Sequence, residues 1–298
     1  MTTADSAKIT RDGSGRKSAW RRLMSRPTGI FSAGVLVVLA VCAMLPTSIL
    51  PHDPTMADSD KRFLPPAFLS GGSSSYLLGT DALGRDIFSM LVAGSRFTLL
   101  IVIGAGLVSL CLGVLVGLVA GFYRGWLDTV FMRFADIQLA FPALVLVIAV
   151  VAAFGPSIRN LILILGFVGW APYARLVRGT VLSLRERGYV QAAVATGIGN
   201  RRILLRHLLP NASTSIAVFF TSELAALVIL EASLSFLGLG VQPPNPSWGA
   251  MIADGRQYMS QAWWATAIPG ALIVIIVLAF NFLGDELRDI LDPALRER

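Results

Sequence analysis

Charged residues are scarce in this sequence, and lysine is nearly absent. Only 14% of the 298 residues are charged, whereas a soluble domain has roughly 25%. Hydrophobic residues make up 55%, and so much apolar surface requires lipid as its solvent. Three of the 25 basic residues are lysine, namely Lys8, Lys17 and Lys61. The net charge of +7 therefore comes from arginine, and in a membrane protein it indicates orientation rather than nucleic-acid binding.

Residues that bind metals or catalyse reactions are also few. Cys42 and Cys111 lie inside apolar runs, and His52 is far from His207 in the sequence. This pattern predicts neither a metal cluster nor a disulfide framework. A membrane-embedded enzyme is disfavoured, because the sequence has no histidine cluster, serine motif or paired intramembrane aspartates. No lysine lies in a G-x-x-x-x-G-K-[ST] loop, so we expect no ATP hydrolysis by this chain and no catalytic, cofactor or metal site in it.

Long apolar runs are what the sequence has instead. A helix that crosses about 30 Å of hydrocarbon needs roughly 20 apolar residues. Three uncharged runs meet this requirement directly: 28–50, 97–123 and 263–284. Three further spans are predicted at 137–158, at 160–181, where the helix continues beyond its apolar part, and at 212–240. The fold class is therefore an all-α membrane protein with six transmembrane helices.

The distribution of basic residues predicts the orientation. Lysine and arginine concentrate before the first span and after the fourth, and the loops expected outside carry few. Both termini are therefore expected in the cytoplasm. The predicted organisation is a basic tail (1–27), a retained anchor helix (28–50), an external loop with an interfacial helix (51–96), a transport domain (97–285) with a cytoplasmic loop at 185–211, and a cytoplasmic tail (286–298).

Glycines in the second span suggest close helix packing. Gly113, Gly117 and Gly121 recur every four residues and so share one helix face. A packing seam is the favoured interpretation, although glycine is common in membrane helices generally. Three prolines, Pro142, Pro172 and Pro269, lie inside predicted spans, where they favour kinks.

Three acids lie at membrane depth: Asp136, Glu223 and Glu231. Such carboxylates either line a pathway or form paired structural groups. Structural pairing is favoured because two of them lie near predicted span ends, where water reaches. Glu231 is the strongest exception.

Two of the three loops that are expected on the external side have distinctive residues in or beside them. Asp81 or Asp86 is predicted to cap a short interfacial helix in which Ile87, Phe88, Leu91 and Val92 share one face, and a plain connector is an equally weighted alternative. Near the last span, Trp263 and Trp264 are predicted to be interfacial anchors.

The segment 188–211 predicts two short helices separated by a glycine turn. Ala192, Ala193 and Ala195 provide a thin surface that can enter a groove on another protein. Gly197 can take the left-handed conformation that ends a helix, and Asn200 can cap the next one. The second helix has an apolar and a basic side, which includes Arg201, and Pro210 is expected to close it before the fifth span. A helix pair of this kind is a docking element.

This segment resembles the EAA loop of ABC importer permeases. The residues at matching spacing are Gln191, Ala192, Ala193, Gly197, His207, Leu209 and Pro210. Gln191 stands where the family has Glu, and His207 stands where it has Ile. Because glutamine carries no charge, we expect no ionic contact between Gln191 and an ATPase subunit. Further segments at 78–99, 231–252 and 281–296 resemble the second permease of the dipeptide, oligopeptide and nickel importer group.

The resemblance implies a type I importer fold in the bacterial inner membrane, where this chain forms half of the translocation pathway. It also implies a homologous second permease, two ATP-binding subunits that hold ATP and Mg²⁺, an external solute-binding protein and surrounding lipid, with no nucleic acid. The ATPase-coupling residues would be Tyr189, Gln191, Ala192, Ala193, Gly197, Arg201, Leu209 and Pro210. Peptides or related small solutes are the expected cargo. The alternative is a secondary transporter driven by an ion gradient through the intramembrane carboxylates.

Overall fold

A computed structural model describes residues 26–291 of the chain, and within this range it is helical. Five helices are long and apolar enough to cross a membrane, and a bent pair of shorter helices makes up to six. The long helices are α2 (Pro27–Met44), α3 (Ile87–Tyr123), α6 (Ile158–Arg185), α9 (Leu209–Phe236) and α11 (Trp264–Leu291). The shorter ones are α4 (Gly125–Leu139), α5 (Ala143–Phe154), α7 (Gly188–Ala195), α8 (Asn200–Ile203) and α10 (Trp248–Gly255).

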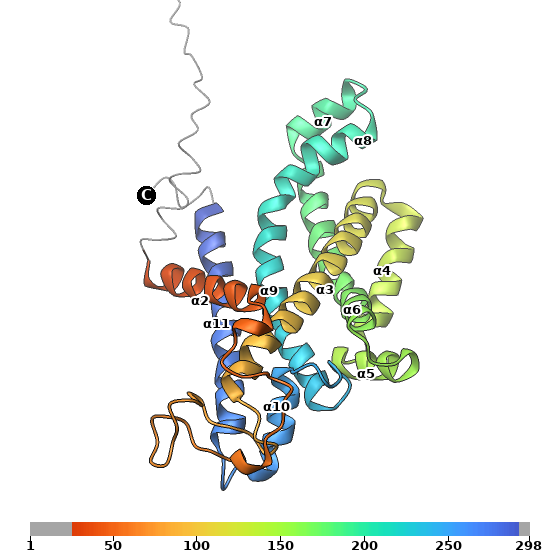
Figure 1. Cartoon of the computed structure of the whole chain (residues 1–298). Helices are drawn as coiled ribbons and strands as arrows, with labels where there is room; N and C mark the ends of the chain where they lie inside the picture. Colours follow the sequence, from red (N-terminus) through yellow and green to blue (C-terminus); the bar gives the residue numbers. More distant parts are fainter. Residues whose placement is uncertain (1–25, 292–298) are drawn as a thin grey trace, which may run out of the picture.

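The long helices form a bundle with two distinct ends. Figure 1 shows α7 and α8 projecting from one end, while α10 and the loop between α2 and α3 lie at the other. The central pair is α3 and α6, and α9 packs against both as well as against α11. We call the two extremes the α7–α8 end and the α10 end.

Helix α2 is shorter than the predicted anchor and lies across α11 in Figure 1. It ends at Met44, two residues before Pro46, and a short 3-10 turn follows at Thr47–Ile49. Because proline disfavours helical conformation in the residue before it, the apolar run to Leu50 does not continue as one helix. The basic tail before Arg26, including Lys8 and Lys17, lies outside the described residues.

The predicted interfacial helix is part of α3 and not a separate element. Helix α3 begins at Ile87 and continues for 37 residues, ten residues earlier than the predicted span. Asp86 is its N-cap, and the Asp86 carboxylate accepts a hydrogen bond from the backbone N–H of Ser89 at 3.0 Å. Asp81 does not cap the helix. Since no proline or helix-ending glycine lies between Ile87 and Phe97, the helix continues without a break.

The predicted third span, 137–158, is wrong as a single helix. Two helices, α4 and α5, meet there at a bend of 90°. Pro142 directly precedes α5, and α4 ends at Leu139. Because proline has a fixed φ and no N–H, it ends the first helix here instead of producing a kink within one span. Asp136 therefore belongs to α4, in the half of the bent pair before the break.

Pro210 does not close the second helix of the 188–211 segment. The helix runs from Asn200 through Pro210 to Phe236, with a π-helical turn at Leu204–Leu208. A wider turn just before a proline relieves the clash between its ring and the preceding carbonyl groups. The cap prediction at Asn200 is also wrong, because Gly199 is the N-cap residue and no side chain caps this helix. The short helix and the following span are thus one continuous rod.

Helix α11 extends two turns beyond the predicted span, to Leu291. In the added part, Glu286 is buried, although it lies in the segment that was predicted to be a cytoplasmic tail. Its carboxylate accepts a hydrogen bond from the Thr28 hydroxyl at 2.6 Å and lies 3.5 Å from the Arg26 guanidinium. These contacts join the start of α2 to the end of α11.

Candidate functional site

The three glycines of α3 face α6 at very close range. A Cβ atom added to Gly113 would lie 2.3 Å from the Cβ of Tyr173, and one on Gly117 would lie 2.7 Å from the carbonyl oxygen of Ala174. A Cβ on Gly121 would lie 2.9 Å from an α6 side chain. Real Cβ atoms do not approach other atoms this closely, so the spacing of the two helices requires glycine at all three positions.

Helix α6 contributes glycines of its own, which the sequence reasoning missed. A Cβ on Gly166 would lie 2.5 Å from the Cβ of Val108, and one on Gly169 would lie 2.2 Å from the Ser109 hydroxyl oxygen. Ser109 donates a hydrogen bond to the Gly166 carbonyl at 2.9 Å. The spacing of three between Gly166 and Gly169 places both on one face and was the available signal.

Two Arg–Asp pairs hold α4 against α6. Arg178 binds Asp128 through two hydrogen bonds, of 2.5 and 2.7 Å. Arg175 donates to the carboxylate of Asp136 at 2.5 Å. Asp136 is thus a half-exposed, paired group. The short bidentate geometry at Asp128 is the kind that fixes both position and orientation.

Glu231 is fully buried in α9 and hydrogen-bonded. Its carboxylate accepts from the Ser235 hydroxyl at 2.8 Å and from the Thr98 hydroxyl at 3.4 Å. The Ser235 oxygen in turn lies 3.4 Å from the Val241 backbone N–H. Glu231 therefore links α9 to α3 and to the loop that follows α9. Asp136 is also paired, so Glu223 is the one acid of the three at membrane depth that has no hydrogen-bond or ion-pair partner among the described residues. A relay of unpaired carboxylates is therefore disfavoured.

Glu223 lies at the middle of α9, beside α3 and α6. Its Oε1 atom would be 2.8 Å from a Cβ on Gly169. No hydrogen bond or ion pair to this carboxylate is formed by residues 26–291. Tyr173 is fully buried on α6, and within the same residues its hydroxyl has no hydrogen-bond partner.

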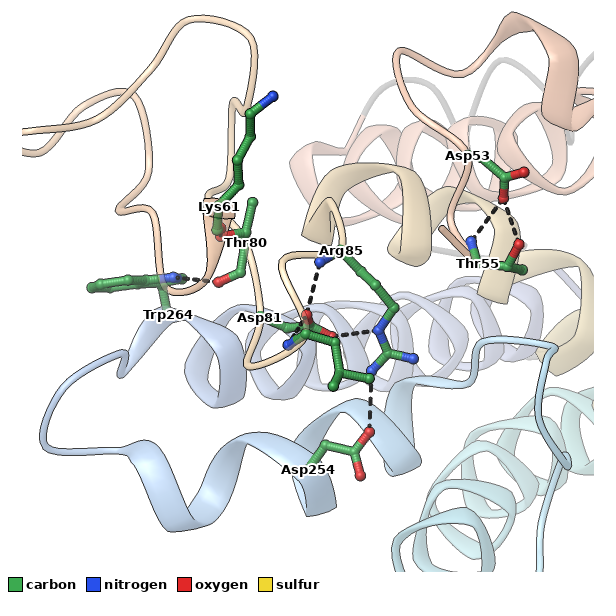
Figure 2. Close-up of polar contacts among 9 residues, drawn as sticks. Asp53, Thr55, Lys61, Thr80, Asp81, Arg85, Asp254 and Trp264 are labelled. Carbon is green, nitrogen blue, oxygen red and sulfur yellow. Dashed lines mark hydrogen bonds and ion pairs between the residues drawn. The ribbon is translucent and has the colours of Figure 1, made fainter. Parts of the chain in front are cut away.

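The α10 end is held together by polar contacts across the sequence (Figure 2). Asp81 accepts hydrogen bonds from the backbone N–H groups of Leu83 and Arg85, at 2.8 and 2.9 Å. Its other oxygen accepts from Arg85 Nε at 2.6 Å, and Arg85 also reaches Asp254, near the end of α10, at 3.3 Å. Asp81 thus closes a turn and aims Arg85 at α10.

Trp264 is part of the same layer and not an interfacial anchor. Its ring is buried, and its Nε1–H donates to the Thr80 carbonyl at 3.2 Å (Figure 2). The Thr80 hydroxyl donates to the Lys61 carbonyl at 2.5 Å and accepts from the Leu64 N–H at 2.8 Å. Trp263, by contrast, is 44% exposed. Only the fold distinguishes these two adjacent tryptophans.

Asp53 begins a local turn in the loop of this layer. Its carboxylate accepts from the Thr55 hydroxyl at 2.7 Å and from the Thr55 N–H at 2.8 Å (Figure 2). These hydrogen bonds stabilise the charged form, so the pKa of Asp53 lies below its usual value.

At the α7–α8 end, Gly197 ends α7 in the left-handed region with φ of +76°. Its N–H donates to the Val194 carbonyl at 3.0 Å, and the Ile198 N–H donates to the Ala193 carbonyl at 3.1 Å. This pair of bonds is the Schellman arrangement, which satisfies the last carbonyls of a helix. Ile198 packs against the buried cluster that contains Val190.

Most of the predicted coupling residues are exposed in this helix pair, but Ala193 is not. Ala193 is buried with Val190 against the bundle, so it does not contribute to the expected docking surface. Leu209 is partly buried. The exposed residues are Tyr189, Gln191, Ala192, Gly197, Arg201 and Pro210. A continuous exposed strip therefore runs along α7 and onto the basic side of α8.

Comparisons with known proteins agree with this architecture. Residues 113–297 match the family "Binding-protein-dependent transport system inner membrane component", and residues 15–66 match "N-terminal TM domain of oligopeptide transport permease C". The first match covers more than half of the chain.

Curated relatives are similar over nearly their whole length. The di/tripeptide transport system permease protein DppC of Pseudomonas aeruginosa is 39% identical over 280 residues, which cover 94% of this chain and 92% of the relative. The glutathione transport system permease protein GsiD of Pectobacterium atrosepticum is 40% identical over 292 residues, with 97% and 95% covered.

These matches and the apolar spans identify a multi-pass protein of the bacterial inner membrane. The region that the first family matches contains the last part of the long α3, with its glycine contacts to α6. It also contains the α7–α8 pair, which lies between two long helices. The chain therefore belongs to the binding-protein-dependent transport system inner membrane components, and within them to the second, C-type permeases of peptide-type ABC importers.

Proposed function

We propose that this chain forms half of the translocation path of an ATP-driven importer for peptides or related small solutes. A homologous second permease completes the path, two separate ATPase subunits bind ATP and Mg²⁺ at the cytoplasmic α7–α8 end, and a solute-binding protein delivers the cargo at the α10 end. The names of the relatives, which refer to di- and tripeptides and to glutathione, support this class of cargo.

The observation that carries the proposal is the connection of the helix pair to two long helices. Helix α7 follows α6 after a two-residue link, and α8 continues through the π-helical turn into α9. A displacement of α7 would therefore be transmitted to both α6 and α9 through short, stiff connections. Rigid-body tilting of long helices is a known way to exchange two access states of a cavity.

Exposure of apolar side chains on α7 supports a partner there. Tyr189 is 42% exposed and Val194 is 53% exposed, at a bundle end that is expected to face water. The neighbouring Arg201, Arg202 and Arg206 are exposed as well. A surface that combines large apolar groups with arginine is typical of protein interfaces.

Two glycines in the same turn provide a matched test. Gly197 has φ of +76°, whereas Gly199 has φ of −61°, and neither would place an added Cβ within 4 Å of another group. Gly197→Ala therefore adds backbone strain of ~1 kcal/mol, which is a factor of about five in the equilibrium constant for this conformation. Gly199→Ser adds no such strain and keeps a residue type that is favoured at an N-cap.

We expect Gly197→Ala to lower peptide uptake and peptide-stimulated ATP hydrolysis by the assembled importer, and Gly199→Ser to leave both unchanged. Copurification of ATP-binding subunits with the wild-type chain is measured alongside. Peptide uptake by this chain alone, with no ATPase subunit attached, would support the gradient-driven alternative and contradict the proposal.

A further inference from the structure

A cavity of about 460 Å³ lies between α6, α9 and α11, in the half of the bundle nearer the α7–α8 end. The part of α9 that lines it belongs to about the first four turns of this helix. Leu176 of α6 and Phe219 of α9 give the cavity apolar walls. Its polar groups are the hydroxyls of Thr214, Ser215 and Ser222 and the guanidinium of Arg288. None of the lining residues is an acid, so the cavity offers hydrogen-bond donors and a positive charge.

Arg288 is placed beside these hydroxyls by the close contact between α9 and α11. A Cβ on Gly284 would lie 2.4 Å from the Thr221 hydroxyl oxygen and 3.7 Å from that of Ser222. The two helices run in opposite directions (Figure 1), so one turn further along α11 corresponds to one turn back along α9. Arg288, one turn after Gly284, therefore lies at a level between Ser215 and Ser222.

The hydroxyls that line the cavity differ from their neighbours on α9. Ser213 donates to a carbonyl three residues earlier in the helix, at 2.7 Å, and Thr221 does the same at 2.8 Å. The hydroxyls of Thr214, Ser215 and Ser222 form no hydrogen bond with any group of residues 26–291. Their O–H groups therefore remain available as donors to a ligand.

The charge of Arg288 is not used by the acids that surround it in the described part of the chain. Glu286 and Asp289, its neighbours on α11, both lie against Arg26 of α2. Asp285 is exposed one turn earlier and does not line the cavity. Since no ion pair to Arg288 is formed by residues 26–291, its guanidinium can bind a carboxylate from outside the chain through two parallel N–H···O hydrogen bonds.

We propose that this cavity binds the terminal carboxylate of the transported solute, with Arg288 as its counter-ion and the α9 hydroxyls as further donors. A site made of donors suits an anion with several lone pairs and does not suit an ammonium. Peptides and glutathione, which the names of the relatives mention, carry a free carboxylate. The inference rests on the proposed function, because it names the part of the cargo that this half of the path recognises.

The test places a reporter thiol in the cavity without removing any of its polar groups. Val218→Cys, at a partly buried lining residue, is made in the assembled importer, and its reaction with N-ethylmaleimide in detergent without ATP is followed by peptide mass spectrometry. Dialanine, with a free carboxylate, is compared with dialanine amide over a range of concentrations. Ser183→Cys, at an exposed residue of α6 outside the cavity, is the control.

The concentration that halves the labelling rate at position 218 should be at least about tenfold lower for dialanine than for its amide, because loss of a charge-assisted hydrogen bond weakens binding by about this factor. Labelling of the control thiol should depend on neither compound. Arg288→Gln should remove the difference between the two compounds. Arg159→Gln, at an exposed arginine in the first turn of α6, should preserve it.

Three results would overturn the inference. The first is equal protection by the two compounds, and the second is no protection by dialanine. The third is a thiol at position 218 that does not react even without peptide, since the cavity would then be filled by a partner chain.

A phospholipid phosphate is the other source of an anion at the end of a membrane bundle. If micelles that contain phosphatidylglycerol slow the labelling at position 218 and dialanine does not, the cavity belongs to lipid and the inference is overturned. Copurification of the ATPase subunits is measured in the same preparations. Equal protection in an importer that contains these subunits overturns the carboxylate site alone, whereas their absence from the wild-type preparation overturns the proposed function.

Discussion

The α10 end and the α7–α8 end of the bundle differ in where their polar side chains find partners. At the α10 end, the Asp81, Arg85 and Thr80 side chains bind groups of the same chain, and Trp264 is buried among them. At the α7–α8 end, Gln191 makes one weak bond of 3.3 Å to the Glu186 carbonyl. These polar side chains of the first end are paired within the chain, whereas the second end leaves exposed side chains that a partner protein can cover.

The largest expected effect is at Trp248 of α10. This ring is fully buried, and its Nε1–H donates to the Leu91 carbonyl at 3.0 Å. Trp248→Ala should lower the free energy of unfolding by about 3–5 kcal/mol, because it leaves a cavity and removes a buried hydrogen bond to α3. Thermal unfolding in nanodiscs measures it. Trp263→Ala, at a half-exposed ring, should cost much less, and an equal loss would mean that the α10 end is not packed as described.

A smaller loss is expected from Asp81→Asn. The substitution removes the charge that pairs with Arg85 and leaves a single oxygen acceptor, which should cost about 1–3 kcal/mol. Asp254→Asn changes the exposed partner of the same arginine and should stay within about 0.5 kcal/mol. Denaturant unfolding of both variants checks the order. The reverse order would place the key contact of Arg85 on α10 and not in its own turn.

Substitutions on the exposed face of the α7–α8 end should change the assembly with the ATPase subunits and not the stability of this chain. Val194 is exposed on α7, so Val194→Asp should change unfolding by no more than about 0.5 kcal/mol while reducing copurification of the ATPase subunits. Val190→Asp places a charge at a fully buried position of the same helix and should destabilise it. Equal thermal shifts for the two variants would contradict the division between a docking face and a buried face.

The smallest effect concerns pH at the α10 end. The lowered pKa of Asp53 means that its ionised form stabilises the fold above the unfolded value of ~3.9, and that this contribution is lost as the pH falls through the folded pKa. The difference in unfolding temperature between wild type and Asp53→Asn should therefore shrink as the pH falls below about 4. A difference that grows on acidification would mean that the Thr55 hydrogen bonds do not favour the charged carboxylate.

The length of the apolar runs predicted the long helices well, but it did not predict where helices end or bend. The runs around α3, α6, α9 and α11 predicted helices close to those observed, because uninterrupted apolar sequence has few alternatives in lipid. The 90° bend between α4 and α5 was missed. A proline can lie inside a helix that continues past it or can end the helix, and Pro172 and Pro142 show the two outcomes.

Candidate site residues were predictable only as residue types. The glycine rhythm of α3 indicated close packing, but its partner surface on α6, with Gly166 and Gly169, requires the two helices to be placed side by side. The acids at membrane depth could not be sorted from the sequence. Asp136 lies 39 residues from Arg175, and of the two hydroxyl groups that bind Glu231 only Ser235 is a sequence neighbour, whereas Thr98 is 133 residues away.

The sequence alone determined the membrane environment, the main helices, the left-handed Gly197 and the family resemblance, because these depend on composition, local backbone freedom and short spacings. Tertiary structure alone decided that Trp264 is buried while Trp263 is exposed, that Ala193 faces inward, and that Glu223 is the one acid of the three at membrane depth with no partner among the described residues. The physical reason is that burial and pairing are set by chain segments distant in sequence, and local pattern carries no information about which segments meet.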